Sequence, residues 1–254
     1  IYQLPPGHAA TWRDGKWNAW RYWELDITPA SHSEAEWEER LRALLAETVD
    51  RHCLSDVPLG AFLSGGLDSA TIVHHMTRAA RAPVDTFTVG FGEEGSRYDE
   101  SVPARALAEH FGSRHHALTV HAHAAELLPT IVQHFDEPFG NPTALLSYCI
   151  AEVVRRHVTV VLSGDGGDEC FGGYPRYVGA GLAGWYRGLP HFLRGGLNSV
   201  IQRLPESTRG LHGLRRLRSF SAGSLLDPVD RYASWVTYYS AAERQALYRD
   251  SLGA

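Results

Sequence analysis

Apolar and polar residues follow two different periods along the chain. Between residues 58 and 162, short apolar and β-branched runs alternate with longer segments whose apolar residues recur at helical spacing. The strand-like runs are PLGAFL, VDTFTVGF, HHALTV and VTVVL. Strands that alternate with helices indicate a parallel sheet with helices on both faces. We therefore expect an α/β fold over this part of the chain.

The helical segments have recognisable ends. Ser33 with Glu36 fits a capping box and predicts a helix that ends near His52. A second helix is expected to begin near Ser101, with Pro103 in its first turn. Further helices are expected over residues 67–81, 123–135 and 143–157. Helical patterns also occur around residues 182–189, 228–239 and 241–250, separated by Gly, Pro and Ser. They predict a helical region, after Gly173, that covers one end of the sheet.

The first 25 residues have a β pattern. Asp14-Gly15 lies between two aromatic-rich segments, which is typical of a hairpin turn. The following residues, DITPASHSEAE, are typical of a linker. The chain begins with isoleucine and ends without a terminal signal, and we expect it to be a piece of a longer protein.

Composition narrows the possible functions. A length of 254 residues is enough for a sizeable core. The composition, with 44% hydrophobic and 21% charged residues, is ordinary for a globular protein. A net charge of −5 gives no global basic field for nucleic acid. Lys16 is the only lysine, so no later lysine can clamp a phosphate. Cys53, Cys149 and Cys170 lack metal-ligand spacing and favour a reduced, cytoplasmic protein. No apolar run is long enough to span a bilayer.

The first candidate site is the turn LSGGLDSA. Gly65 and Gly66 allow a tight turn and a close approach of the backbone to a ligand. The helix that starts at Leu67 presents unpaired N–H groups to this turn, which makes an anion site. Ser64 and Ser69 add hydroxyl donors.

Asp68 is the unexpected residue in that turn, because a carboxylate repels a phosphate. A Mg²⁺ ion between the two removes the conflict, so Asp68 is a candidate metal ligand. The alternative is an ordinary helix start, in which Asp68 is stabilised by the helix dipole.

A second turn of the same kind follows the strand VTVVL. In SGDGGDE, three glycines accompany three acids, which are Asp165, Asp168 and Glu169. Carboxylates so close in sequence repel one another unless a cation or a positively charged substrate lies nearby. Asp168 is thus a candidate second ligand of the same Mg²⁺. The alternative is a solvated acidic loop, which the preceding apolar strand disfavours.

These motifs resemble a known family. SGGLDS is similar to the pyrophosphate loop of the ATP-pyrophosphatases, which cleave ATP between the α and β phosphates. LSGDGGDECFGGYPRY resembles the second signature of the glutamine-hydrolysing asparagine synthetases. FTVGFGEEGSRYDES and FDEPFGNPTALLSY are also similar to that family. The resemblance covers residues 37–177 well and continues more weakly through the helical region.

The resemblance implies an α/β fold of the adenine nucleotide alpha hydrolase-like type and a two-step reaction. ATP and Mg²⁺ would adenylate the side-chain carboxylate of aspartate, and ammonia would then displace AMP to give asparagine. The residues expected at pyrophosphate and Mg²⁺ are Ser64, Gly65, Gly66, Asp68 and Ser69, with Asp168 sharing the metal. Backbone at Leu63 and Val89 would hold adenine, and Ser163 and Gly164 would lie by the nucleotide and acyl group. Asp165 would lie near the α-phosphate or ammonia, while Asp136, Glu137 and Glu169 would line the substrate region.

The same resemblance divides the chain into two parts. Residues 1–25 resemble the last strands of the family's glutaminase domain, and residues 26–254 resemble its synthetase domain. The family's cysteine nucleophile has no counterpart here, so this chain alone should not hydrolyse glutamine. Its late functional lysine is also absent, so we expect the isolated chain to be weakly active or inactive. The implied partners are small molecules and a glutaminase domain, without nucleic acid or membrane, and a homodimer is allowed.

Three alternatives remain at this level. The motifs also occur in amidotransferase-like and lactam-forming enzymes that act on other carboxylic acids. A nucleotide-binding module without catalysis would not need both Asp68 and Asp168. A tRNA-modifying relative would usually need a basic face, which the net charge of −5 disfavours.

Overall fold

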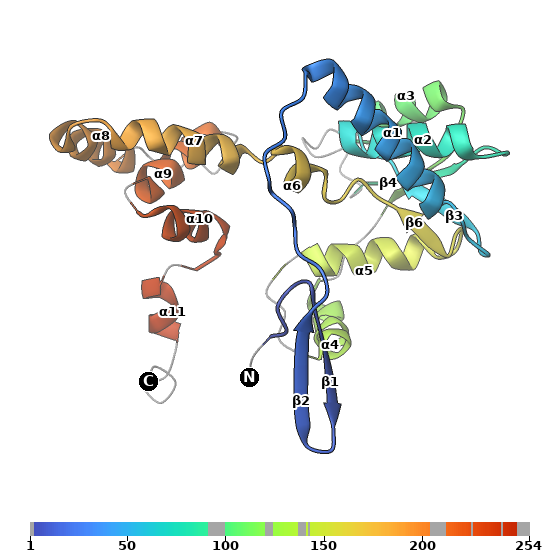
Figure 1. The fold of residues 1–254 in the computed structure, drawn as a ribbon, viewed down its shortest axis with the longest axis horizontal. Coiled ribbons are helices and arrows are strands. Elements are labelled where there is room, and N and C mark those ends of the chain that lie inside the picture. The colour runs from blue at the N-terminus through green and yellow to red at the C-terminus, as the bar shows by residue number, and fades with distance from the viewer. Residues whose placement is uncertain are drawn as a thin grey trace. The chain divides into compact units, whose positions relative to one another are not determined.

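The computed structural model describes residues 3–90, 100–119, 124–136, 141, 143–203, 212–224, 226–239 and 241–247. The chain forms two compact units, Ile1–Ser55 and Asp56–Ala254 (Figure 1). The domain boundary predicted after residue 25 came from the resemblance to a glutaminase domain and a synthetase domain. It is a different division from these two units, and it stays a prediction.

The first unit contains a hairpin and a long helix. Strands β1 (His8–Arg13) and β2 (Lys16–Arg21) pair antiparallel, with Trp12 opposite Trp17. Asp14 and Gly15 both have positive φ, 51° and 75°, as a type I′ turn requires. The predicted hairpin is therefore confirmed.

Helix α1 spans Glu34–His52, as the capping box predicted. The Glu36 N–H donates to the Ser33 hydroxyl at 3.3 Å, and the Ser33 N–H donates to the Glu36 carboxylate at 2.8 Å. These two bonds satisfy N–H groups that the start of a helix would otherwise leave unpaired.

The second unit is built on a four-stranded parallel sheet. Its strands are β3 (Leu59–Phe62), β4 (Asp85–Gly90), β5 (Arg114–Thr119) and β6 (Val160–Leu162). Their spatial order is β5-β4-β3-β6, and every neighbouring pair is parallel. Strand β6, which is far from β3 in sequence, thus lies directly beside it, with Ala61 opposite Leu162.

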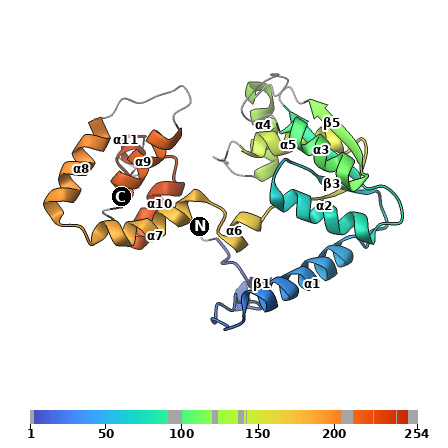
Figure 2. The same ribbon diagram turned by 90° about the horizontal axis from the view of Figure 1, so that it is seen from above.

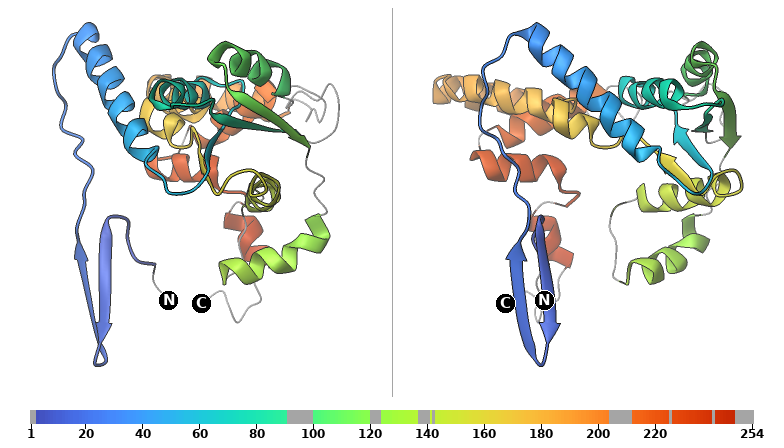
Figure 3. Two further views of the ribbon diagram at one scale, coloured as in Figure 1. Left: turned by 90° about the vertical axis from the view of Figure 1, so that its right-hand side faces the viewer. Right: turned by 45° about the vertical axis from the view of Figure 1, so that its right-hand side comes forward.

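Helices cover both faces of this sheet. Helices α2 (Leu67–Ala79) and α3 (Ser101–Phe111) lie on one face, and α5 (Thr143–Val154) lies on the other, next to α4 (Ala124–Phe135) (Figures 1 and 3). Between the sheet and α5, Phe87, Val154 and Val158 form a buried apolar cluster. The predicted α/β class is confirmed, as is the start of α3 at Ser101.

In the described part of the chain, six further helices follow the sheet (Figure 2). They are α6 (Gly167–Phe171), α7 (Pro175–Arg187), α8 (His191–Arg203), α9 (His212–Gly223), α10 (Pro228–Val236) and α11 (Ala241–Leu247). The predicted helical region is confirmed, although the pattern did not predict α6, α8 or α9 individually. The expected position of this region over one end of the sheet stays a prediction.

The two Ser-Gly turns meet because β3 and β6 are neighbours. A Cβ atom placed on Gly164 would lie 2.7 Å from the Ser69 backbone nitrogen and 2.9 Å from the Asp68 Cβ. A Cβ on Gly167 would lie 2.6 Å from the Asp68 Oδ2. Real Cβ atoms do not approach other atoms so closely. Glycine at these two positions therefore allows the second turn to pack against the first turn of α2.

In the part of the chain that the structure describes, no helix combines the length and the apolar character needed to cross a membrane.

A Gly164→Ala substitution should destabilise the protein. The new methyl group would collide with the Ser69 backbone, which cannot move without shifting α2. Overpacking of this kind costs about 1–3 kcal/mol in the free energy of unfolding. The measurement is urea-induced unfolding followed by circular dichroism.

Gly181→Ala on α7 is the matched control. A Cβ there meets no atom of the described residues within 4 Å. Alanine in an open helical position should instead stabilise by about 0.5–1 kcal/mol. A Gly164→Ala protein as stable as the wild type would contradict the close packing of the two turns.

Candidate functional site

A cleft of about 690 Å³ opens where β3 and β6 end. Its walls come from both Ser-Gly turns, α5, α6 and Tyr174, which lies just before α7. The predicted site residues that line it are Ser64, Gly66, Asp68, Ser69, Ser163, Gly164, Asp165, Asp168 and Glu169. Two segments about a hundred residues apart in sequence thus share one cleft, at the strand ends where open α/β sheets bind ligands.

The first turn is held closed by its own serines. The Ser64 N–H donates to the Ser69 hydroxyl at 3.0 Å, and the two hydroxyl oxygens lie 2.8 Å apart. The Gly66 N–H donates to the Ser64 hydroxyl at 3.1 Å. Ser69 is buried, with 6% of its surface exposed. These hydroxyls therefore shape the turn in the free protein.

Helix α2 begins at this turn without a capping side chain. Its N-cap residue is Gly66, which has extended backbone angles and supplies no side-chain acceptor. The N–H groups at the start of a helix need an acceptor from a side chain, from water or from a ligand. The positive end of the helix dipole is directed at the same place. The start of α2 is thus suited to an anionic group such as a phosphate.

The second turn brings its acids to the opposite wall. Gly166 has a positive φ of 94°, and the chain then enters α6 with Asp168 and Glu169 in the first turn. The Ser163 hydroxyl donates to the Asp165 carboxylate at 2.9 Å, and the Asp165 N–H donates back to that hydroxyl at 3.4 Å. This local pair fixes the Asp165 carboxylate at the beginning of the turn.

Asp68 and Asp168 are the residues that could hold a metal. The Asp68 carboxylate faces the first turn of α6, since a Cβ on Gly167 would touch it. Among the described residues, no group of three or more His, Cys, Asp or Glu side chains could bind a metal by itself. Mg²⁺ usually takes only one or two protein carboxylates and completes its shell with water and substrate phosphates. Two carboxylates in a phosphate-binding cleft fit that pattern.

Glu169 makes a contact that the sequence did not predict. The Tyr174 hydroxyl donates to the Glu169 Oε1 at 2.6 Å, and both residues line the cleft. This hydrogen bond lowers the pKa of Glu169 and raises the pKa of Tyr174. The Arg176 guanidinium lies over the Tyr174 ring, 3.7 Å from its centroid. Tyr174 and Arg176 both belong to the GGYPRY segment. Nothing in the spacing of that segment predicted that Tyr174 would reach back to Glu169 on α6.

Other predicted site residues lie outside the set that lines the cleft. Leu63 is buried, and its N–H donates to the Phe87 carbonyl at 2.9 Å. Val89 lies near the end of β4, and Gly65 lies at the top of the first turn, where it contacts Pro103. Asp136 has a positive φ of 54° after the end of α4. Glu137 lies outside the described residues. Their predicted roles stay predictions.

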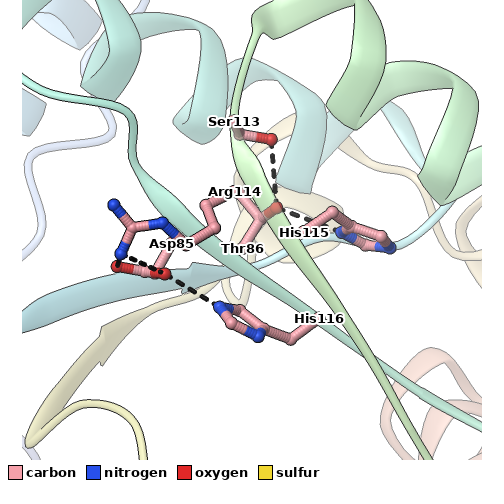
Figure 4. Close-up of polar contacts among 6 residues, drawn as sticks. All are labelled: Asp85, Thr86, Ser113, Arg114, His115 and His116. Atoms are coloured by element: carbon pink, nitrogen blue, oxygen red, sulfur yellow. Dashed lines mark hydrogen bonds and ion pairs between the residues drawn. The ribbon is translucent and has the colours of Figure 1, made fainter.

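A separate polar cluster lies at the other end of the sheet (Figure 4). Asp85, at the start of β4, contacts His116 at 2.8 Å and Arg114 at 3.4 Å. Thr86 contacts the neighbouring His115 at 3.1 Å, and burial lowers the pKa of that histidine. Because these residues are at the amino ends of the strands, they tie β4 to β5 and take no part in the cleft.

The family model and several curated relatives indicate one family. The family model described as asparagine synthase matches residues 40–251. A protein of Methanocaldococcus jannaschii, named provisionally as asparagine synthetase [glutamine-hydrolyzing] 2, is 37% identical over 84% of this chain and 41% of its own. Asparagine synthetase [glutamine-hydrolyzing] 1 of Bacillus subtilis is 34% identical over 85% of this chain and 34% of its own. The chain thus spans well under half the length of these relatives.

Among solved structures, the NH3-dependent NAD synthetase of Campylobacter jejuni in complex with the nitrate ion covers 75% of this chain and 97% of its own. Its TM-score of 0.36 and identity of 13% are too low to bear on fold or function. The family match extends over most of the chain and includes both turns of the cleft. The chain therefore belongs to the asparagine synthase family.

Proposed function

We propose that this chain supplies the ATP-dependent half of a carbon–nitrogen ligase of the asparagine synthetase type. The side-chain carboxylate of aspartate attacks the α-phosphate of ATP and releases pyrophosphate. Ammonia then attacks the resulting acyl-adenylate, so that asparagine and AMP leave. The main support is that two turns with one candidate metal carboxylate each, Asp68 and Asp168, line a single cleft.

The first step is opposed by electrostatic repulsion between two anions. A carboxylate must approach a polyphosphate, so the site has to neutralise negative charge and align the reacting groups more than it needs a strong base. The uncapped start of α2 offers backbone N–H groups for this purpose. The chain has no lysine beyond Lys16, so at the pyrophosphate the metal and these N–H groups would supply the positive charge.

The residues of the first turn would bind the pyrophosphate. Backbone at Gly65 and Gly66 and the hydroxyls of Ser64 and Ser69 would face the β- and γ-phosphates. Since the two hydroxyls already bond to each other, a serine O–H can rotate and donate to a phosphate oxygen without rebuilding the turn. Backbone near Leu63 and Val89 would hold the adenine.

Asp68 and Asp168 would hold Mg²⁺, as the two facing turns allow. The ion would neutralise charge on the phosphate oxygens and on the leaving pyrophosphate. Ser163 and Gly164 would lie beside the nucleotide and the acyl group. Asp165, whose carboxylate is fixed by Ser163, would lie near the α-phosphate or the incoming ammonia.

Asp136, Glu137 and Glu169 would border the bound acid. Ammonia would come from a glutaminase domain, as the names of the glutamine-hydrolysing relatives suggest. The proposed active form is a homodimer that binds neither nucleic acid nor a membrane. The three free cysteines agree with a reducing, cytoplasmic location.

Asp68→Asn and Asp168→Asn should each lower turnover about a hundredfold or more, because each removes a charge that positions Mg²⁺ for the transition state. The measurement is the rate of AMP release by the full-length protein that contains this chain, with saturating ATP, aspartate and ammonia. Urea unfolding of each variant checks that the fold is retained.

Asp50→Asn on α1 is the matched control, because its side chain is exposed on the first unit. Its turnover should equal that of the wild type. Unchanged turnover in the Asp68 variant would remove that residue from the proposed site.

A screen of carboxylic acids should identify the substrate. Exchange of labelled pyrophosphate into ATP reports adenylation alone, so it needs no ammonia. Aspartate should support exchange well above any other acid of similar size. Exchange with another acid but not with aspartate would replace the asparagine synthetase assignment by a related amide- or lactam-forming ligase. Exchange with no acid would contradict adenylation altogether.

A further inference from the structure

The cleft contains more negative charge than the proposed chemistry uses. Four acids line it, namely Asp68, Asp165, Asp168 and Glu169. Two are assigned to Mg²⁺, and Asp165 is engaged by Ser163. Glu169 remains, in a cleft whose ligands are a polyphosphate and a carboxylate. A carboxylate directed at anions weakens their binding unless it faces a positive group of the ligand.

Glu169 is held in place by a contact outside the acid cluster. Tyr174 lies just before α7 and reaches back across Gly172 and Gly173 to the short helix α6. Its hydroxyl lies 2.6 Å from Glu169 Oε1, within the range for a hydrogen bond to an ionised carboxylate. A carboxylate has about four acceptor positions, so this bond leaves capacity for a ligand donor.

Arg176 in turn holds Tyr174. Its guanidinium lies 3.7 Å from the centre of the Tyr174 ring and 5.8 Å from that of Tyr232 on α10. Among the described residues, Arg176 forms no ion pair with a carboxylate, and its buried Nε has no hydrogen-bond partner. Arg176 therefore stacks on the ring that orients Glu169 and does not bind the carboxylate itself.

This arrangement orients the carboxylate without neutralising it through a direct ion pair. We propose that Glu169 accepts an ammonium group in the cleft and that Tyr174 and Arg176 are positioning residues for it. The inference rests on the proposed function. The ammonium comes from one of two sources, the α-ammonium of the amino-acid substrate or the ammonia that enters as ammonium.

Aspartate and succinate separate these sources, since succinate has the same two carboxylates and no ammonium. If the α-ammonium of aspartate is the source, Glu169→Gln in the full-length protein that contains this chain raises the KM for aspartate in pyrophosphate exchange about tenfold or more, the value expected for losing a charged hydrogen bond. The KM for ATP should stay unchanged. Exchange with succinate should not weaken, so the preference for aspartate over succinate should fall by the same factor.

Tyr174→Phe keeps the ring under Arg176 and removes only the hydroxyl. It should change the aspartate preference in the same direction by a smaller factor, with the KM for ATP again unchanged. Arg176→Met should likewise lower the preference for aspartate over succinate without altering the KM for ATP. Glu109→Gln, on the exposed side of α3, and Tyr238→Phe, which is 71% exposed, are the matched controls and should behave as wild type.

The outcomes are distinct. A loss of the preference for aspartate over succinate means that Glu169 binds the α-ammonium of the substrate. Unchanged pyrophosphate exchange together with a raised KM for ammonia in amide formation means that Glu169 binds the incoming ammonium. This inference is wrong, and the proposed function stands, in either of two cases. In the first, an active Glu169→Gln enzyme has unchanged KM values for aspartate and for ammonia. In the second, its KM for ATP rises as much as its KM for aspartate. If the wild type supports exchange with no acid, the proposed function fails and this inference fails with it.

Discussion

The cleft depends on the pairing of β3 with β6. Parallel strands place their carboxyl ends at one edge of the sheet, so this single pairing brings the two Ser-Gly turns side by side. At Gly164 and Gly167 the absence of a Cβ atom then lets the second turn approach Asp68. Backbone packing, rather than any bond between side chains of the two turns, is what sets their separation.

The electrostatics of the cleft follow from that packing. Bringing four carboxylates into one cleft is unfavourable in the free protein, and it is sustained because each has a different local environment. Asp165 accepts a bond from Ser163, and Glu169 accepts one from Tyr174. Asp68 lies beside the backbone of α6. The apolar cluster between the sheet and α5 contributes to the stability of the unit, and Phe62 and Ile150 connect this cluster to the lining of the cleft.

Much of this could be predicted from local sequence. The strands, the capping box at Ser33 and the hairpin turn at Asp14 have strong short-range signals, and the structure has them where expected. Glycine and serine after an apolar strand likewise marked both turns. The contact of Tyr174 with Glu169 could not be predicted, because it depends on how the chain reverses through two glycines after α6. Helix α6 itself has only five residues, too short for a periodic pattern to emerge. Helices α8 and α9 are interrupted or bordered by glycines, which weakened their helical signal.

Strand β6 has only three residues and pairs on one side alone, which makes it an edge strand of the described sheet. Edge strands with so few hydrogen bonds open more readily than the strands between them. Opening of β6 would carry one whole wall of the cleft away from the other, so local unfolding and loss of the binding site are a single event. A ligand that bridges both turns is therefore coupled thermodynamically to the closure of β6, and part of its binding free energy appears as stability of this edge.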